Sequence, residues 1–244
     1  MNRSRLLITL LLLFGLSPAK AIPVDLGLSL VIDVSGSVSA TEYDLMMDGY
    51  AEAFRDTDIQ NKLLDGSNGA VAINAIFFSD SAFTTTLDDF QILTTVTEID
   101  LFADLLDNFA RPGSGGTNAS AGMNKATSLL TATSGPETNS LVMDVSGDGT
   151  GNVVNDQAAR DAAAAAGITV NGLSIGGIGI DNYYTANIIT ADGFLQPSAS
   201  FADFDAAVKT KIELEAGGSA PEPGTLVLMA SALVGLRLRL RRRA

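Results

Sequence analysis

The sequence predicts an α/β domain with a doubly wound, mostly parallel sheet flanked by helices and one antiparallel edge strand. Apolar runs of strand length alternate with segments whose apolar residues recur at helical spacing. Most of these runs are nearly continuous, which is typical of parallel strands buried on both faces. Several runs end in polar or glycine-rich turns, and that edge of a doubly wound sheet is where ligands bind.

The first half of the domain is expected to start with a strand over 24–34. Ser39 with Glu42 forms a capping box that starts a helix. A second strand is expected over 70–78, with 82–87 pairing as its antiparallel hairpin edge, and a helix over 98–109. The core face of the first helix comprises Tyr43, Met46, Met47, Tyr50 and Phe54.

The second half starts with a glycine-rich loop at 111–116 and repeats the alternation of helix and strand. Glycine at 167 stops an alanine-rich helix. The expected elements are a helix over 117–130, a strand over 140–145, a helix over 153–166, a strand over 168–175, a short helix over 182–190, a weak strand starting at 194–195 and a closing helix over 201–215.

Residues 1–21 have the features of a secretory signal peptide. A basic start precedes an apolar run of 11 residues, Leu6 to Leu16, and a small-x-small site follows at 19–21. We predict cleavage after Ala21. An N-terminal membrane anchor is the alternative, but the run is shorter than the ~20 residues that span a bilayer.

A single domain over 22–216 is followed by a linker with a Pro-Glu-Pro motif (217–223) and by a hydrophobic, arginine-rich tail (224–244). Motif, hydrophobic helix and terminal arginines together resemble the PEP-CTERM sorting signal. That resemblance implies transient anchoring in the inner membrane, processing by an exosortase, and delivery to the cell surface or extracellular matrix. A permanent C-terminal anchor is the alternative.

Composition excludes several classes of function. The segment 22–219 has 27 acidic and 7 basic residues, which argues against binding of nucleic acid or anionic lipid, so contact with the membrane is expected only through the tail. The chain contains no Cys, so its core must hold without disulfides, and no His. Without His, the Gly-x-Ser-x-Gly match at 172–176 cannot supply a Ser-His-Asp triad.

Three segments place oxygen ligands at the expected ligand edge of the sheet. The segment 33–37 reads Asp-Val-Ser-Gly-Ser, a threonine follows the glycine-rich loop, and an aspartate follows the strand from 140. Such donors suit a hard cation such as Mg²⁺ and poorly suit Zn²⁺ or copper. In the alternative reading, the serines only cap a helix and the last aspartate lies in a turn. The candidate metal residues are Asp33, Ser35, Ser37, Thr117 and Asp148.

This constellation resembles the metal-ion-dependent adhesion site (MIDAS) of von Willebrand factor A (VWA) domains. The resemblance extends from Val24 to Ala216, and segments such as 144–149 are similar to an uncharacterised bacterial subfamily. It implies that the two serines and Thr117 bind the metal directly and that the aspartates bind it directly or through water. One coordination position stays open for a carboxylate of the partner.

We therefore expect an exported, monomeric and non-enzymatic binding module that needs Mg²⁺, with Mn²⁺ or Ca²⁺ as alternatives, and that grips an acidic group of a protein or glycan. No catalytic residue is assigned. A structural matrix component with a vestigial site is one alternative. A metal-assisted hydrolase is weaker, because the sequence supplies no evident base.

Overall fold

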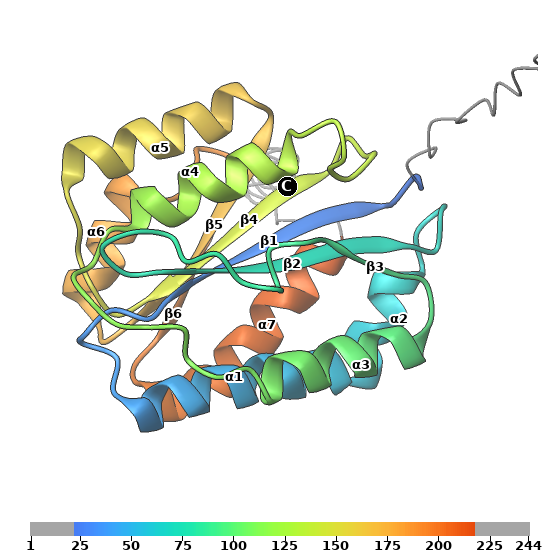
Figure 1. Cartoon of the computed structure of the whole chain (residues 1–244), viewed down its shortest axis with the longest axis horizontal. Coiled ribbons are helices and arrows are strands. Elements are labelled where there is room, and N and C mark those ends of the chain that lie inside the picture. The colour runs from blue at the N-terminus through green and yellow to red at the C-terminus, as the bar shows by residue number, and fades with distance from the viewer. Residues whose placement is uncertain (1–21, 218–244) are drawn as a thin grey trace, which may run out of the picture.

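The computed structural model of the 244-residue chain describes residues 22–217, which form one six-stranded sheet covered by helices on both faces (Figure 1). The strand order is β3-β2-β1-β4-β5-β6, and only β3 is antiparallel to its neighbour. The expected fold class is therefore confirmed. The strands are β1 (Leu26–Asp33), β2 (Val71–Phe78), β3 (Gln91–Leu93), β4 (Leu141–Gly147), β5 (Ile168–Ile175) and β6 (Leu195–Ser198).

Helices α1, α2, α3 and α7 cover one face of the sheet, and α4, α5 and α6 cover the other (Figure 1). A short 3-10 turn, Phe201–Asp203, leads into the last helix. The helices are α1 (Ala40–Arg55), α2 (Thr57–Leu64), α3 (Val96–Asp107), α4 (Ala119–Leu130), α5 (Val153–Ala165), α6 (Ile178–Asn187) and α7 (Phe204–Ala216).

Most elements lie where the sequence predicts them, within a few residues. The capping box of α1 is confirmed: Ser39 N donates to Glu42 Oε2 at 2.8 Å, and Glu42 N donates to Ser39 Oγ at 3.3 Å. Helix α2, capped by Asp56, was not expected, and α6 begins at Ile178 rather than at 182.

The expected hairpin edge over 82–87 is wrong. That segment follows β2 through isolated contacts, in which Phe83 N donates to Phe77 O and Ala75 N donates to Leu87 O, and it forms no strand. The antiparallel strand is β3, which pairs Gln91 with Ile73 and Leu93 with Val71. The polar Thr-Thr-Thr run at 84–86 gives the earlier segment no continuous apolar face, so it stays a loop.

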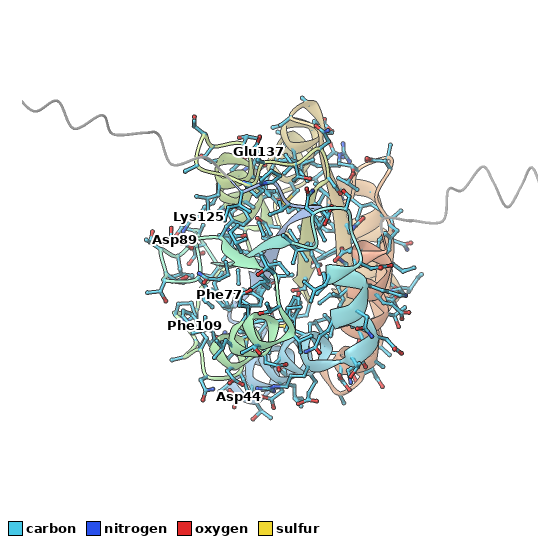
Figure 2. The ribbon with its side chains drawn as sticks, turned by 90° about the vertical axis from the view of Figure 1, so that its right-hand side faces the viewer. Asp44, Phe77, Asp89, Phe109, Lys125 and Glu137 are labelled. Carbon is cyan, nitrogen blue, oxygen red and sulfur yellow. The ribbon has the colours of Figure 1, made fainter. Side chains whose placement is uncertain are left out.

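Two buried clusters, one on each face of the sheet, fix the strand ends. Leu28, Leu30 and Ile32 of β1 pack toward α1, α3 and α7, while Val31 packs toward α4. Aromatic contacts extend the first cluster to the loop after α3, where Phe109 stacks on Phe77 with ring centroids 5.0 Å apart (Figure 2). The glycine-rich loop that follows Phe109 is therefore anchored to the sheet at its start.

Residues outside 22–217 include the predicted signal peptide and sorting tail, so those two predictions lie outside the described residues. Within 22–217, no helix combines the length and the apolar character that a bilayer crossing requires.

Helix α4 approaches the sheet closely through a glycine. A Cβ at Gly122 would lie 2.7 Å from Val31 Cγ1 and 2.9 Å from Phe78 Cδ1. These distances are shorter than van der Waals contact, so any larger side chain must push α4 outward. Because Thr117 lies two residues before the start of α4, this contact also sets the depth of the loop that contains it.

We expect Gly122→Val to lower the free energy of unfolding by about 2–3 kcal/mol, since overpacking a close contact typically costs that much. Ser128→Val, at an exposed position of the same helix, is the matched control and should change it by less than about 0.5 kcal/mol. Urea denaturation followed by circular dichroism measures both. Equal midpoints for the two variants would contradict this account of the packing.

Candidate metal centre

The ends of β1 and β4 and the loop before α4 meet at the carboxyl edge of the sheet. Parallel pairing of β1 with β4 sets Ile32 beside Ser146, so the residues after both strands emerge together. This is the switch point of the sheet, where chain order reverses on either side of β1. The five residues predicted as metal ligands lie in these three segments.

Four of the five side chains form one chain of oxygen contacts. Thr117 Oγ1 donates to Ser35 Oγ at 3.1 Å, and Ser35 Oγ lies 3.1 Å from Ser37 Oγ. Ser37 Oγ donates to Asp148 Oδ1 at 2.7 Å. The structure thus joins Ser37 and Asp148, which are 111 positions apart in the sequence, by a direct hydrogen bond.

Asp33, the fifth member, is completely buried beneath this chain. Its Oδ1 accepts a hydrogen bond from Ser35 N at 2.7 Å, but its Oδ2 has no partner among the described residues. Burial raises the pKa of Asp33 to about 6, the hydrogen bonds from Ser35 oppose the rise, and the nearby charge of Asp148 adds to it. A buried carboxylate oxygen without a donor is the kind of group that a bound cation satisfies.

Two glycines leave room for these oxygens. A Cβ at Gly147 would lie 2.7 Å from Asp33 Oδ2 and 2.8 Å from Tyr184 Oη, and one at Gly149 would lie 2.7 Å from Thr117 Oγ1. Residues with side chains at either position would therefore displace a candidate ligand. In the sequence these glycines indicate only a turn.

Arg111 is a member of the site that the sequence analysis missed. Its Nη2 donates to the carbonyl oxygens of Val34 and Ser35, at 2.7 Å each, and so holds the loop between the two serines. The available signal was weak: Arg111 is one of few basic residues in an acidic domain, and it begins the glycine-rich loop.

Asp80 and Asp156 hold the segment around Thr117. Asp80 Oδ1 accepts from Gly116 N at 2.8 Å, and Asp156 Oδ1 accepts from Ser120 N at 2.9 Å. These contacts fix both sides of Thr117 without using its hydroxyl. The hydroxyl can therefore stay directed toward Ser35.

The donor set fits a small, hard cation. Ligands 2.0–2.1 Å from an octahedral Mg²⁺ lie about 2.9 Å from their neighbours, and the three oxygen contacts here measure 3.1, 3.1 and 2.7 Å. Three of the five donors are hydroxyls. Accordingly, no group of three or more His, Cys, Asp or Glu residues suited to a metal occurs within 22–217. Ser35, Ser37, Thr117, Asp33 and Asp148 are the residues that could hold the ion.

Solved structures of VWA-type proteins share this fold. The chain is 13% identical to the von Willebrand factor type A protein from Catenulispora acidiphila, with a TM-score of 0.57 over 80% of this chain and 43% of that one. The chain is 16% identical to the pilus adhesin SpaC from Lactobacillus rhamnosus GG, with a TM-score of 0.57 over 79% of this chain and 31% of that one. At these identities the likeness shows the fold, which is that of VWA domains.

A third neighbour has been solved with a metal bound. Proximal thread matrix protein 1 (PTMP1) from the mussel byssus has been solved with a zinc-occupied MIDAS motif. It is 15% identical, with a TM-score of 0.55 over 80% of this chain and 47% of that one. The present chain thus spans less than half the length of these three neighbours.

Two family models match the sequence. One, described as "Protein of unknown function (DUF1194)", matches residues 23–220, and the other, the PEP-CTERM protein-sorting motif, matches residues 219–243. The second match supports the predicted sorting signal. Among curated proteins, no sequence matches the chain.

The raised pKa of Asp33 predicts how the metal-free protein responds to pH. Because the folded pKa lies above the unfolded value of 3.8, the folded state holds the proton more tightly, and stability is lost as pH rises from about 4 through about 6. The total loss should reach about 3 kcal/mol, since one pKa unit corresponds to about 1.4 kcal/mol. Asp33→Asn should remove this component, and urea denaturation in chelator at pH 4.5 and 7.5 measures about two thirds of it, because the loss starts below pH 4.5. An unchanged difference between the two pH values in the variant would contradict the assignment to Asp33.

Proposed function

Because the chain belongs to the family described as a protein of unknown function (DUF1194), its function must be inferred from its site, and we propose a divalent-cation-dependent binding module. The proposed partner is an acidic group of a protein or glycan at the cell surface or in the extracellular matrix. The observation that supports this proposal best is the chain of four linked side chains, Thr117, Ser35, Ser37 and Asp148, above the buried Asp33, whose Oδ2 has no partner within residues 22–217.

The proposed coordination uses Ser35, Ser37 and Thr117 as direct ligands, with Asp33 and Asp148 binding directly or through water. A bound cation would supply a Lewis-acidic position for a carboxylate of the partner. Few direct charges favour this role, because neutral hydroxyls leave most of the ion's charge for an incoming acid. The overall acidity of the domain makes direct attraction of an acidic partner unfavourable, so the cation would provide the attraction.

Mg²⁺ is the proposed ion, with Mn²⁺ or Ca²⁺ as alternatives, on the basis of the hard oxygen donors. The zinc in the PTMP1 motif shows that such a motif can accept other divalent ions in that protein. Metal identity is therefore a part of the proposal that a titration with several ions should resolve.

Export supports the extracellular role. The PEP-CTERM motif implies export and membrane-anchored sorting, and exosortase is the expected processing partner. The neighbours by fold include an adhesin and a thread matrix protein, which favours a non-enzymatic module. A matrix component with a vestigial metal site is the second candidate, supported by the fold shared with PTMP1. A metal-assisted hydrolase finds less support, because no histidine is present to act as base.

We expect millimolar Mg²⁺ to bind the purified full-length protein and to raise its melting temperature, because the ion binds the folded state only. Asp33→Ala and Asp148→Ala should each weaken binding at least tenfold, since each removes a charged oxygen from the site. Asp89→Ala, which removes an exposed carboxylate outside the site, is the matched control and should bind like the wild type. Isothermal titration calorimetry and thermal denaturation with Mg²⁺, Mn²⁺, Ca²⁺ and Zn²⁺ measure these effects. A wild-type protein that ignores all four ions would favour the vestigial site.

A further inference from the structure

A buried ion cluster, separate from the metal centre, joins α7 to the sheet. Lys211 Nζ lies 2.7 Å from Asp144 Oδ1 in β4 and 2.5 Å from Glu215 Oε1, one turn further along α7. The three side chains are 0%, 0% and 1% exposed. Lysine and carboxylates are rarely buried so completely, and the proposed binding function uses none of these groups.

The cluster also has a polar neighbour in β5 and an aromatic neighbour. Asn171 Nδ2 of β5 donates to Glu215 Oε1 at 2.8 Å, and the ring of Phe194 lies 5.5 Å from Lys211 Nζ. The hydroxyl of Tyr50 in α1 donates instead to Ser146, at 3.0 Å. Lys211 is therefore held in place with its ammonium group shielded from bulk solvent.

The charges of the cluster do not balance, and some of its oxygens lack hydrogen-bond partners within residues 22–217. It has two carboxylates and one ammonium, and among the described residues Glu215 Oε2 has no hydrogen-bond partner. Both oxygens of Asp144 also lack an aligned partner there, although Oδ1 is in close contact with the amine. Burial raises the pKa of Asp144, and it raises the pKa of Glu215 to about 7. A proton on one of the carboxyls is thus favoured near neutral pH.

We propose that Lys211 and Asp144 condense into an intramolecular isopeptide bond, with Glu215 as the catalytic acid and base. A buried amine in contact with a carboxyl group, beside a second carboxyl group that can carry protons, is the arrangement that amide formation requires. This proposal is independent of metal binding.

The reaction needs no co-reactant. One proton passes from the Lys211 ammonium to the Asp144 carboxylate, which gives a neutral amine and a carboxylic acid. Nζ then attacks Cγ of Asp144, Glu215 takes a proton from the nitrogen and returns it to the departing hydroxyl, and the Cγ–O bond breaks. An N–C bond has formed and one water molecule leaves, while Glu215 ends in its starting state.

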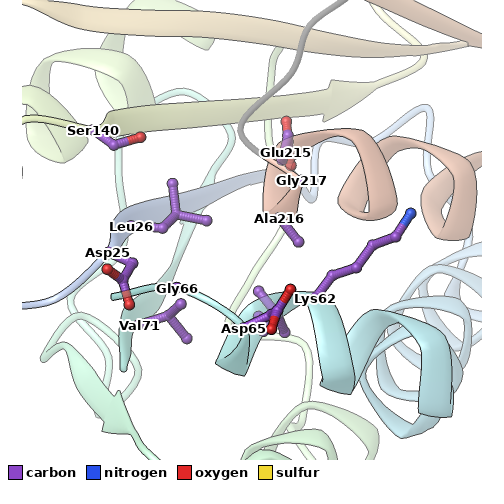
Figure 3. Close-up of a pocket in the computed structure, with 11 residues that line it drawn as sticks. Asp25, Leu26, Lys62, Asp65, Gly66, Val71, Ser140, Glu215, Ala216 and Gly217 are labelled. Atoms are coloured by element: carbon purple, nitrogen blue, oxygen red, sulfur yellow. The ribbon is translucent and has the colours of Figure 1, made fainter. Parts of the chain in front are cut away.

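Burial makes the separate ions energetically costly, and for the same reason it favours the uncharged amide product. An amide has no net charge, so condensation removes one ammonium and one carboxylate from the interior. The remaining N–H of Lys211 would face Glu215 Oε1, its present neighbour. Glu215 also lines a cavity of about 290 Å³ with Leu26, Ala216 and Gly217, which gives the released water a nearby exit (Figure 3).

A cross-link here would take the place that disulfides have in other exported proteins. The chain has no Cys, and α7 is the last helix before the sorting tail. A bond from α7 to the central part of β4 would secure the element through which the tail is attached.

Mass spectrometry of the full chain, purified from cells and denatured, tests the proposal. Trypsin should yield a branched peptide that joins residues 126–160 to the peptide starting at Thr210, because a modified Lys211 is not cleaved. The branched peptide should be lighter by one water than the sum of its parts. Fragmentation should place the link between Asp144 and Lys211.

Variants of the same helix provide the controls. Lys211→Arg should lack the cross-link and migrate more slowly in a denaturing gel, whereas Lys209→Arg, at the partly exposed lysine two residues away, should keep it. Glu215→Gln should leave most of the protein unlinked. Should Lys211→Arg fail to fold, the wild-type digest still decides the question.

Two results would overturn the proposal. One is a wild-type digest in which trypsin cleaves after Lys211, whether peptide 126–160 is unmodified or has lost water at another site such as the Asp148–Gly149 pair. The other is a link to Asn171 with loss of ammonia, which would rule out Asp144 as the acceptor. Neither result depends on added metal, so both are distinguishable from failure of metal binding.

Discussion

The central strand β1 ends in a carboxylate that the fold places out of reach of water. All eight residues of β1 are buried, and Asp33 is the last of them. A buried carboxylate needs donors or a cation, and the structure supplies only part of this through Ser35 N and the nearby charge of Arg111. The close approach of Gly147, the position of Arg111 and the gathered hydroxyls all follow from the need to accommodate this one group.

Strand β4 contributes buried residues to both faces of the sheet, and the residue after it contributes a candidate ligand at the carboxyl edge. Met143 and Val145 pack with α4 and α5 in one buried cluster, while Asp144 points to the opposite face and contacts Lys211 of α7. Four residues later, Asp148 leaves the strand at its carboxyl edge and accepts a hydrogen bond from Ser37. Alternation along the strand places Asp144 on the α7 face, and the length of strand after it separates this ion cluster from the metal centre at the carboxyl edge.

Local signals were sufficient for most of the fold and for the five candidate ligands. The capping box at Ser39 and the long apolar runs are set by neighbouring residues, so they can be read from sequence. Arg111, β3 and the burial of Lys211 could not be read in this way. Lys211 with Glu215 has the i, i+4 spacing of an exposed helical pair, and only the packing of α7 against the sheet, at β5, β6 and Asp144 of β4, buries it.

The partner of Asp144 could not be predicted from the sequence either. The sequence indicates a structural carboxylate, because Asp144 has apolar strand neighbours, but it cannot name a partner that is 67 residues away. The proposed metal centre lies at the carboxyl ends of β1 and β4, whereas Glu215 lies near the opposite ends of β1, β2 and β4. If a partner is held at the first site while the tail anchors the chain after α7, the load between them crosses the contact of α7 with β4. That contact includes Lys211, the one fully buried lysine within residues 22–217.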